Sequence, residues 1–229
     1  QGGAPDPSQL FPFPLDDFQL EAIDALNQGH SVVVSAPTGS GKTLIGEYAI
    51  HRAMAHGQKV FYTTPLKALS NQKLRDFRAQ FGAENVGLMT GDLSVNRDAS
   101  IVVMTTEIFR NMLYAEADEH DDPLADVEAV VLDECHYMND SQRGTVWEES
   151  IIHSPPPIQL VALSATVANA GQLTDWIEKV HGPTTLVLSD FRPVPLHFGF
   201  CSAKGLHPLL NEQGTGLHPN CKVWRAPKG

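Results

Sequence analysis

Seven short apolar segments rich in β-branched residues recur along the chain, and the segments between them have apolar positions at helical spacing. The seven strand candidates are residues 31–36, 59–64, 85–91, 100–106, 129–134, 159–166 and 184–189. The clearest helical segments are 43–57 and 69–82, and Gly82 suits the end of the second. Apolar strands that alternate with helices are typical of a parallel sheet covered on both faces. We therefore expect an α/β fold with a mostly parallel sheet of about seven strands.

Most polar motifs of the chain directly follow a predicted strand. Right-handed crossover connections bring such loops to one edge of the sheet, where open α/β sheets bind ligands. The pattern weakens after residue 190, where Pro, Gly and His become frequent. We expect one domain over residues 1–190 and an exit segment, or the start of another domain, over residues 191–229.

Composition favours a soluble globular domain, with 42% hydrophobic and 19% charged residues among 229. No apolar run reaches the roughly 18 residues of a membrane span. The net charge of -11 counts mildly against a nucleic-acid binder, although a local basic patch is sufficient for binding. Much of the acid is concentrated in residues 115–128, which we expect to form a solvated loop. The first residue is Gln1, so we expect a fragment or a shortened form.

The three cysteines, Cys135, Cys201 and Cys221, form no CxxC pair. A sparse, odd number of cysteines fits a reducing compartment. His218 and Cys221 could supply two metal ligands, but no second ligand pair stands nearby in the sequence, which disfavours this alternative.

A glycine-rich segment between a predicted strand and a predicted helix has the sequence SAPTGSGKT over residues 35–43. Its spacing is that of the phosphate-binding pattern GxxxxGK[ST], with Ala36 where the first glycine usually stands. Glycine permits the positive φ angles of a tight loop, and the helix start adds a partial positive charge. The predicted nucleotide-binding residues are Pro37, Thr38, Gly39, Ser40, Gly41, Lys42 and Thr43. The alternative is a glycine-rich turn with an exposed lysine.

Two adjacent carboxylates, Asp133 and Glu134, end another apolar strand. Mg²⁺ takes one or two carboxylates together with waters and phosphate oxygens, so we expect Asp133 and the Thr43 hydroxyl to hold Mg²⁺. Glu134 is then placed to orient and deprotonate the attacking water, with Lys42 on the β- and γ-phosphates. The alternative is a helix start that favours acidic residues.

Six motifs in order give the chain a specific resemblance: APTGSGKT, PLKALSNQK, TGD, TTEIFRNMLY, DECH and LSAT. They resemble motifs I, Ia, Ib, Ic, II and III of superfamily-two DExH-box helicases. The segments DECHYMNDSQRGTVWEESII and DFRPVPLHF are most similar to the superkiller-type (Ski-like) RNA helicases. The segment HFGFCSAKGLHPLLNEQGT is most similar to the chloroplast and cyanobacterial members. The resemblance covers about residues 11–215 and implies a P-loop, RecA-like domain.

This resemblance implies roles for further residues. Phe13 would stack on adenine and Gln19 would hydrogen-bond its edge. The alternative is a buried Phe13 and a surface Gln19. His136 would link the ATP site to Ser164 and Thr166, which could instead only cap the next helix. The implied contacts to a single strand are Pro65, Lys67, Ser70, Asn71, Thr90, Gly91, Asp92, Thr105, Thr106, Glu107 and Arg110, unless these residues serve only as helix caps.

Members of the resembled family hydrolyse ATP between two RecA-like domains, and the second domain supplies arginine fingers in a pattern like QxxGRxGR. No such pattern occurs here. We therefore expect this chain to bind Mg-ATP and single-stranded RNA, to hydrolyse ATP slowly, and to unwind nothing alone. The implied partners are the missing second domain and an RNA-processing complex. The implied location is the bacterial cytoplasm or the chloroplast stroma.

Three other functions are alternatives to this expectation. A DNA helicase of the same superfamily is disfavoured by the patterns in residues 134–151 and 192–196, which look more like the RNA branch. A nucleotide-gated RNA clamp without turnover is disfavoured for the whole protein because Lys42, Asp133 and Glu134 are intact, but it stays an alternative for this chain in isolation. A small-molecule kinase on the same loop would leave the segments 65–73 and 105–114 unexplained.

Overall fold

The computed structural model describes residues 3–115, 122–136, 144–190, 199–202 and 205–208. The chain divides into two compact units, Gln1–Phe191 and Arg192–Gly229. In the second unit, strands β9 (Gly199–Ser202) and β10 (Gly205–Pro208) pair antiparallel. The segment His218–Cys221, considered above for metal binding, lies outside the described residues, as do residues 191–198 of the family-like segment 190–198.

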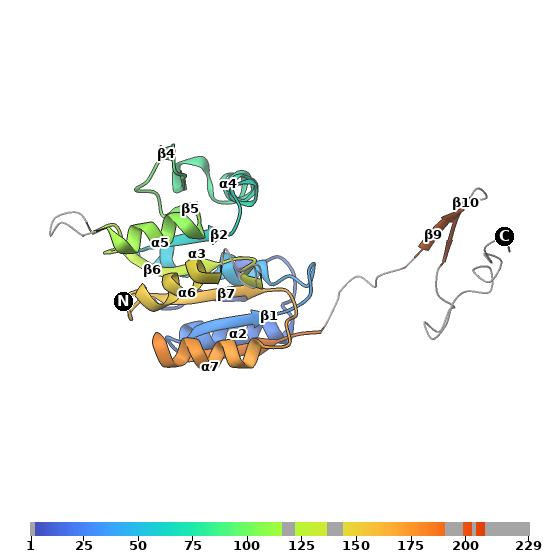
Figure 1. Cartoon of the computed structure of the whole chain (residues 1–229). Coiled ribbons are helices and arrows are strands. Elements are labelled where there is room, and N and C mark those ends of the chain that lie inside the picture. Colours follow the sequence, from blue (N-terminus) through green and yellow to red (C-terminus); the bar gives the residue numbers. More distant parts are fainter. Residues whose placement is uncertain (1–2, 116–121, 137–143, 191–198, 203–204, 209–229) are drawn as a thin grey trace, which may run out of the picture. The chain divides into compact units, whose positions relative to one another are not determined.

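The first unit contains a sheet in the order β4-β3-β5-β2-β6-β7-β1-β8 (Figure 1). Its strands are β1 (Ser31–Ser35), β2 (Lys59–Thr64), β3 (Val86–Met89), β4 (Ser94–Val95), β5 (Ile101–Thr105), β6 (Val127–Leu132), β7 (Gln159–Ser164) and β8 (Thr184–Leu188). All seven predicted strands form, and wherever two of them are adjacent in the sheet they pair in parallel. The eighth is the two-residue edge strand β4, which pairs antiparallel with β3.

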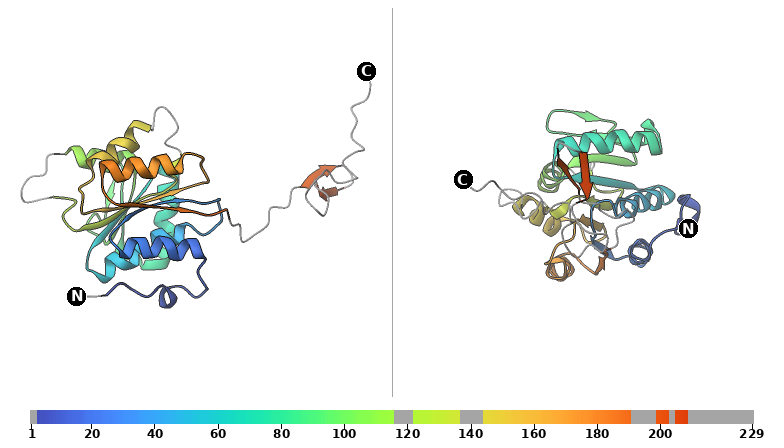
Figure 2. Two further views of the ribbon diagram at one scale, coloured as in Figure 1. Left: turned by 90° about the horizontal axis from the view of Figure 1, so that it is seen from below. Right: turned by 90° about the vertical axis from the view of Figure 1, so that its right-hand side faces the viewer.

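Helices cover both faces of this sheet, as Figure 2 shows. One apolar core contains residues of α2 (Asp17–Asn27), α3 (Thr43–Ala55) and α4 (Lys67–Phe81). The core on the other face contains residues of α5 (Thr106–Tyr114), α6 (Gly144–His153) and α7 (Ala170–Val180). The short helix α1 (Pro7–Leu10) and the 3-10 turn η1 (Ala83–Asn85) complete the described elements of this unit. The expected α/β fold is therefore confirmed.

Two glycines explain local features near the β3–β4 edge. Gly82 ends helix α4 with a φ of 91°, as predicted from the sequence. A Cβ atom at Gly87 would lie 2.1 Å from the carbonyl oxygen of Asn96. The backbone after β4 therefore approaches β3 so closely that only glycine fits at this position.

The strand order divides the loops at the carboxyl edge into two groups. The loops after β6, β7 and β1, which are neighbouring strands, carry the DECH, LSAT and phosphate-loop motifs. The loops after β3, β5 and β2, also neighbours, carry the other three motifs. Since β2 pairs with β6, the two groups meet along this pair, which we call the β2–β6 seam.

Candidate functional site

The phosphate loop connects β1 to α3 and is shaped by two glycines. Gly39 and Gly41 have φ angles of 80° and 90°, which favour glycine. Lys42 is the N-cap residue of α3 and is only 6% exposed, and its Nζ donates to the carbonyl oxygen of Ala36 at 3.1 Å. The alternative of an exposed lysine in a plain turn is therefore wrong. The loop instead points a buried cation inward.

Two observations show that these residues fit an anionic group. The buried Oγ atom of Ser40 has no hydrogen-bond partner within the part of the chain that the structure describes. Burial lowers the pKa of Lys42, and the negative charges of Glu134 and Asp133 oppose this effect. A buried ammonium and an unpaired hydroxyl at a helix start are groups that a phosphate would satisfy.

The carboxylate of Asp133 accepts two hydrogen bonds and forms one ion pair. Its Oδ2 accepts a hydrogen bond of 2.6 Å from the Tyr62 hydroxyl, and Lys73 Nζ lies 3.9 Å from the same oxygen. Its Oδ1 accepts from the backbone N–H of Glu134 at 2.8 Å. Asp133 itself is 6% exposed at the carboxyl end of β6. A carboxylate with a defined orientation suits a metal ligand. Among the described residues, no three or more His, Cys, Asp or Glu side chains cluster so that they could hold a metal ion by themselves.

Glu134 has a left-handed backbone with a φ of 53°. This conformation is uncommon for a residue other than glycine and is found at functional sites. The Glu134 side chain is 33% exposed, and its Oε2 lies 3.1 Å from Nε2 of His136. The sequence carried no sign of this backbone conformation.

His136 joins the loop after β6 to the loop after β7. Its Nδ1 accepts a hydrogen bond of 3.1 Å from the backbone N–H of Ala165, which lies between Ser164 and Thr166. Because Nδ1 accepts, Nε2 carries the ring proton and faces Glu134. Ser164 is buried and donates to the Ala165 carbonyl at 2.7 Å, whereas Thr166 is exposed. The structure thus links His136 and Ser164 through the backbone of Ala165, and Thr166 follows Ala165 in the chain.

Cys135 stands inside this group of residues and is 3% exposed. Burial raises the pKa of its thiol to about 12. The thiol therefore remains protonated at neutral pH and is unsuited to nucleophilic or metal-binding roles.

The candidate adenine segment has an exposed aromatic ring and a buried amide. Phe13 is 52% exposed and lines a pocket of about 540 Å³ between α1 and residues 11–15. Gln19 is 4% exposed, accepts from the Asp16 backbone N–H and donates to the Gly41 carbonyl at 2.9 Å. The alternative of a buried Phe13 and a surface Gln19 is wrong. Gln19 connects the adenine segment directly to the phosphate loop.

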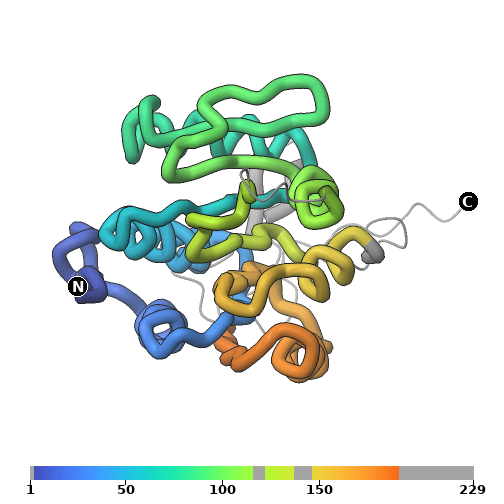
Figure 3. Tube along the Cα trace, turned by 90° about the vertical axis from the view of Figure 1, so that its left-hand side faces the viewer, coloured from blue at the N-terminus to red at the C-terminus, as the bar shows by residue number. Residues whose placement is uncertain are grey.

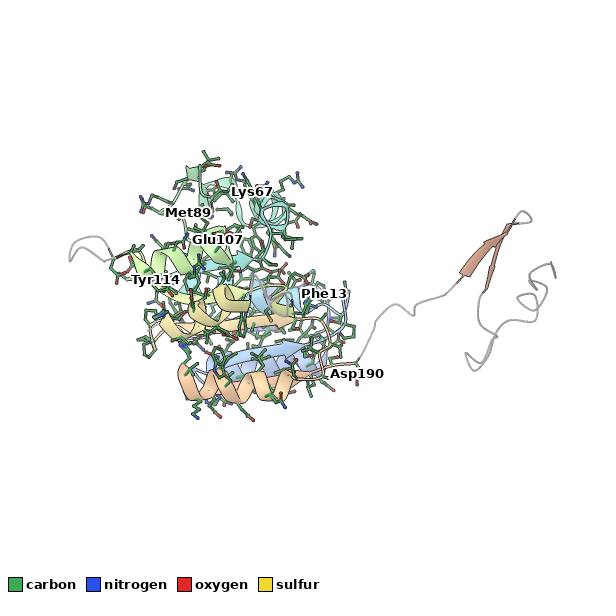
Figure 4. All side chains as sticks on the ribbon, in the orientation of Figure 1. Phe13, Lys67, Met89, Glu107, Tyr114 and Asp190 are labelled. Carbon is green, nitrogen blue, oxygen red and sulfur yellow. The ribbon has the colours of Figure 1, made fainter. Side chains whose placement is uncertain are left out.

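The predicted nucleic-acid residues lie at or after the carboxyl ends of β2, β3 and β5. Figures 3 and 4 show the β3–β4 region and α4 at one end of the sheet, with Lys67 and Glu107 on that side and away from Phe13. The exposed members are Lys67, Asn71, Gly91, Asp92 and Glu107. The partly buried members are Pro65, Thr90, Thr105, Thr106 and Arg110.

One member of the predicted track is misplaced. Ser70 is completely buried, and its hydroxyl lies 2.7 Å from that of Thr64. Helix spacing explains this finding, because Ser70, Leu74 and Phe77 lie on the same face of α4 and turn toward the core. Ser70 therefore ties α4 to β2 and does not face a ligand.

Three other predicted members make contacts within the protein. Thr105 accepts from the Ile108 N–H as the N-cap of α5, and Thr106 donates to the Thr64 carbonyl. The Nη1 atom of Arg110 lies 3.8 Å from Oε2 of Glu149, and its Nη2 atom lies 4.0 Å from Oε1 of Glu107. The positive charge of Arg110 is therefore partly compensated. Sequence reasoning missed Glu149, Tyr62 and Lys73, although Lys73 is four residues before Phe77 and shares its side of α4.

Comparison with known proteins gives consistent relatives. The DEAD/DEAH box helicase family matches residues 16–173. The chain is 54% identical over 211 residues to the DExH-box ATP-dependent RNA helicase DExH15, chloroplastic, of Arabidopsis thaliana, covering 91% of this chain and 18% of the relative. It is 46% identical over 217 residues to the antiviral helicase SKI2 of Saccharomyces cerevisiae, covering 94% and 17%. The chain thus spans less than a fifth of the length of these two relatives.

Solved structures share the fold. The Mycobacterium smegmatis helicase Lhr bound to single-stranded DNA and AMP-PNP matches with a TM-score of 0.64 and 26% identity over 83% of this chain and 27% of that chain. The Pyrococcus furiosus Hef helicase domain matches with a TM-score of 0.58 and 23% identity over 77% and 38%. Across the described ranges, no helix combines the length and apolar character that crossing a membrane requires.

Proposed function

Because this chain belongs to the DEAD/DEAH box helicase family, we propose that it is the ATP-binding first RecA-like domain of an ATP-dependent RNA helicase. The observation that carries the proposal is the clustering of three loops on neighbouring strands β6, β7 and β1. They supply a buried lysine, an oriented carboxylate and a glutamate–histidine pair. These are the groups that binding and hydrolysis of a nucleoside triphosphate require.

In this proposal the residues of the chain have separate tasks. Lys42 and the backbone of the phosphate loop hold the phosphates, and Thr43 and Asp133 hold Mg²⁺, which neutralises charge on the phosphate oxygens. Glu134 orients the attacking water, and His136 connects Glu134 to Ala165. Phe13 and Gln19 contact the adenine.

The nucleic-acid ligand is proposed to be single-stranded RNA. The support is the name and high identity of the Arabidopsis relative, an RNA helicase. The loops after β2, β3 and β5 offer backbone groups and the exposed side chains of Lys67 and Asn71, which suit a sugar–phosphate backbone without reading bases. DNA is the second candidate, because the Lhr structure at 26% identity holds single-stranded DNA.

The whole protein is proposed to contain a second RecA-like domain that completes the ATP site. The relatives are more than five times as long as the part that this chain matches, which leaves room for it. Repeated closure of the two domains on the strand would drive translocation and unwinding, within an RNA-processing complex. The proposed location is the bacterial cytoplasm or the chloroplast stroma, and a chloroplastic and a mycobacterial helicase are among the relatives.

The test measures nucleotide binding and ATP turnover of this chain alone, with single-stranded RNA and with the matching DNA. We expect nucleotide binding, and turnover close to that of a Glu134→Gln control in all three conditions. The chain should bind single-stranded RNA, and it should bind the matching DNA more weakly, because a protein can distinguish the two by the 2′-hydroxyl of RNA. Absence of nucleotide binding would overturn the proposal. Stronger binding of DNA than of RNA would assign the chain to the second candidate.

A further inference from the structure

A cluster of polar and aromatic side chains lies at the β2–β6 seam, and all of its members except Asp133 have no role in the function proposed above. It consists of Tyr62 on β2, Lys73 and Phe77 on α4, and Asp133 after β6. We call these four residues the seam cluster. It is the place where the loops assigned to nucleotide and those assigned to nucleic acid come into contact.

Tyr62 is buried completely beneath the nucleotide loops. Its hydroxyl donates to Asp133 Oδ2 at 2.6 Å, and its ring packs edge-on against Phe77 with centroids 4.8 Å apart. A buried tyrosine hydroxyl with an aromatic ring packed on its side has little freedom to move. Tyr62 therefore holds one oxygen of Asp133 in a fixed place relative to β2.

Lys73 reaches the same oxygen from helix α4. Its Nζ lies 3.9 Å from Asp133 Oδ2, 5.6 Å from the Tyr62 ring centroid and 5.8 Å from that of Phe77. Its side chain is 21% exposed. Two aromatic faces and one carboxylate thus define where the ammonium group sits, which distinguishes Lys73 from a surface lysine that is free to rotate.

The hydrogen bond from Tyr62 and the ion pair with Lys73 involve only one of the carboxylate oxygens. Tyr62 and Lys73 both approach Oδ2, while Oδ1 receives the backbone N–H of Glu134. Rotation of the carboxylate about its last bond would break these contacts. Because Lys73 follows the exposed residues Lys67 and Asn71 on α4, a shift of that helix would move the ammonium group relative to Oδ2.

We propose that Tyr62 and Lys73 are positioning residues that orient the Asp133 carboxylate for the metal–nucleotide complex, and that Lys73 makes this orientation respond to strand binding at the start of α4. The inference rests on the proposed function. The inference adds to the proposed function by assigning the link between the nucleotide and the single strand to one side chain, that of Lys73. The occupant of the first turn of α4 would be the single strand, and the occupant at Asp133 would be Mg²⁺ with a nucleoside triphosphate.

The first experiment measures the Kd of a fluorescent ATP analogue for this chain in EDTA and in saturating Mg²⁺. The variants are Lys73→Met, Lys73→Arg and Tyr62→Phe, with Lys59→Met as a control, because Lys59 pairs with the exposed Asp98 and lies outside the site. We expect Lys73→Met and Tyr62→Phe to reduce the gain in affinity from Mg²⁺ by about tenfold, the effect of losing about one interaction, without changing the Kd in EDTA. Lys73→Arg should restore most of the gain.

A merely structural role would give a different result. It would lower the urea midpoint of the variants and leave the ratio of the two Kd values equal to that of Lys59→Met, which would overturn the positioning role. If the parent chain binds no nucleotide in either condition, the proposed function itself fails. The two failures are therefore distinguishable.

The second experiment measures the affinity of single-stranded RNA with and without the Mg–nucleotide analogue. We expect the nucleotide to change the RNA Kd of the parent chain severalfold and to change that of Lys73→Met by a factor close to one. Linkage requires the same factor in the reverse titration. If parent and Lys73→Met give equal factors, including no change in either, the link through Lys73 is overturned, while the first experiment still decides the positioning of Asp133.

Discussion

His136 accepts a hydrogen bond of 3.1 Å through Nδ1 from the backbone N–H of Ala165. This contact determines the tautomer of the ring, and the remaining ring proton on Nε2 faces Glu134 at 3.1 Å. One imidazole therefore connects the residue proposed to orient water with the loop after β7. The connection depends on a main-chain donor, so it is insensitive to the side chain at position 165.

His136→Ala should uncouple these loops while leaving nucleotide binding intact. In the proposed whole helicase we expect the proposed RNA-stimulated ATP turnover to fall about tenfold or more, because a hydrogen bond to a charged group stabilises by about 1.5–3 kcal/mol. The Kd of nucleotide for this chain should change less than about twofold, within the scatter of variants that lack a contact to ligand. Equal losses in binding and in turnover would show that His136 acts on the bound nucleotide itself.

Ser70 and Asn71 are neighbours in sequence and should behave in opposite ways. Ser70→Ala removes the buried hydroxyl contact with Thr64 and should destabilise the fold by about 1 kcal/mol, with little direct effect on RNA affinity. Asn71→Ala alters an exposed side chain, so stability should change by less than about 0.5 kcal/mol while RNA affinity falls. Urea unfolding and RNA titration of both variants separate the two effects. A loss of RNA affinity in a stably folded Ser70→Ala protein would contradict the assignment.

Gly87→Ala should destabilise the chain by about 2 kcal/mol, since overpacking against fixed backbone typically costs about 1–3 kcal/mol. Its Cβ atom would lie 2.1 Å from the Asn96 carbonyl oxygen and 2.8 Å from that of Val95. Gly91→Ala is the matched control, because a Cβ atom there meets nothing within 4 Å. Equal urea midpoints for the two variants would mean that the β3–β4 edge can separate without cost.

The raised pKa of Glu47 predicts that the stability of the folded chain depends on pH. Burial raises the pKa of its carboxyl above 4.5, against the opposing effects of Gln80 and Lys73. Between 4.5 and the raised pKa the folded chain binds more protons than the unfolded chain, so the stability contributed by Glu47 falls as the pH rises through this window. Glu47→Gln should therefore be more stable than the parent at pH 7 and lose this advantage below pH 4.5.

Urea unfolding of the parent and of Glu47→Gln at several pH values from 4 to 7 tests this expectation. The exposed Glu178 on α7 supplies the control variant Glu178→Gln, which should follow the parent. An advantage of Glu47→Gln that is constant with pH would show that the charge of Glu47 is not the cause.

The strands and the motifs could be predicted from the sequence because each depends on local pattern. Apolar runs such as residues 129–134 identify buried strands, and the glycine–lysine spacing identifies the phosphate loop. Strand β4 could not be predicted in this way. It has only two residues, and it pairs because Gly87 lets the backbone approach.

The errors in the site have a similar cause. The motif pattern alone predicts Ser70 on a ligand surface, whereas its place on α4 turns it inward. Tyr62 and Lys73 meet Asp133 only after β2 and β6 become neighbours in the sheet. Contacts of this kind depend on the strand order and on the packing of α4, which no local pattern encodes.

The left-handed backbone of Glu134 has a consequence for engineering this domain. A residue with a Cβ atom is held there at a cost of about 1 kcal/mol that glycine would not incur. Selection for thermal stability alone would therefore favour Glu134→Gly. The selected variant would lack the carboxylate proposed for hydrolysis. Stability and the proposed activity therefore make opposite demands at this position, so thermostable versions of the domain should be sought with residue 134 kept constant.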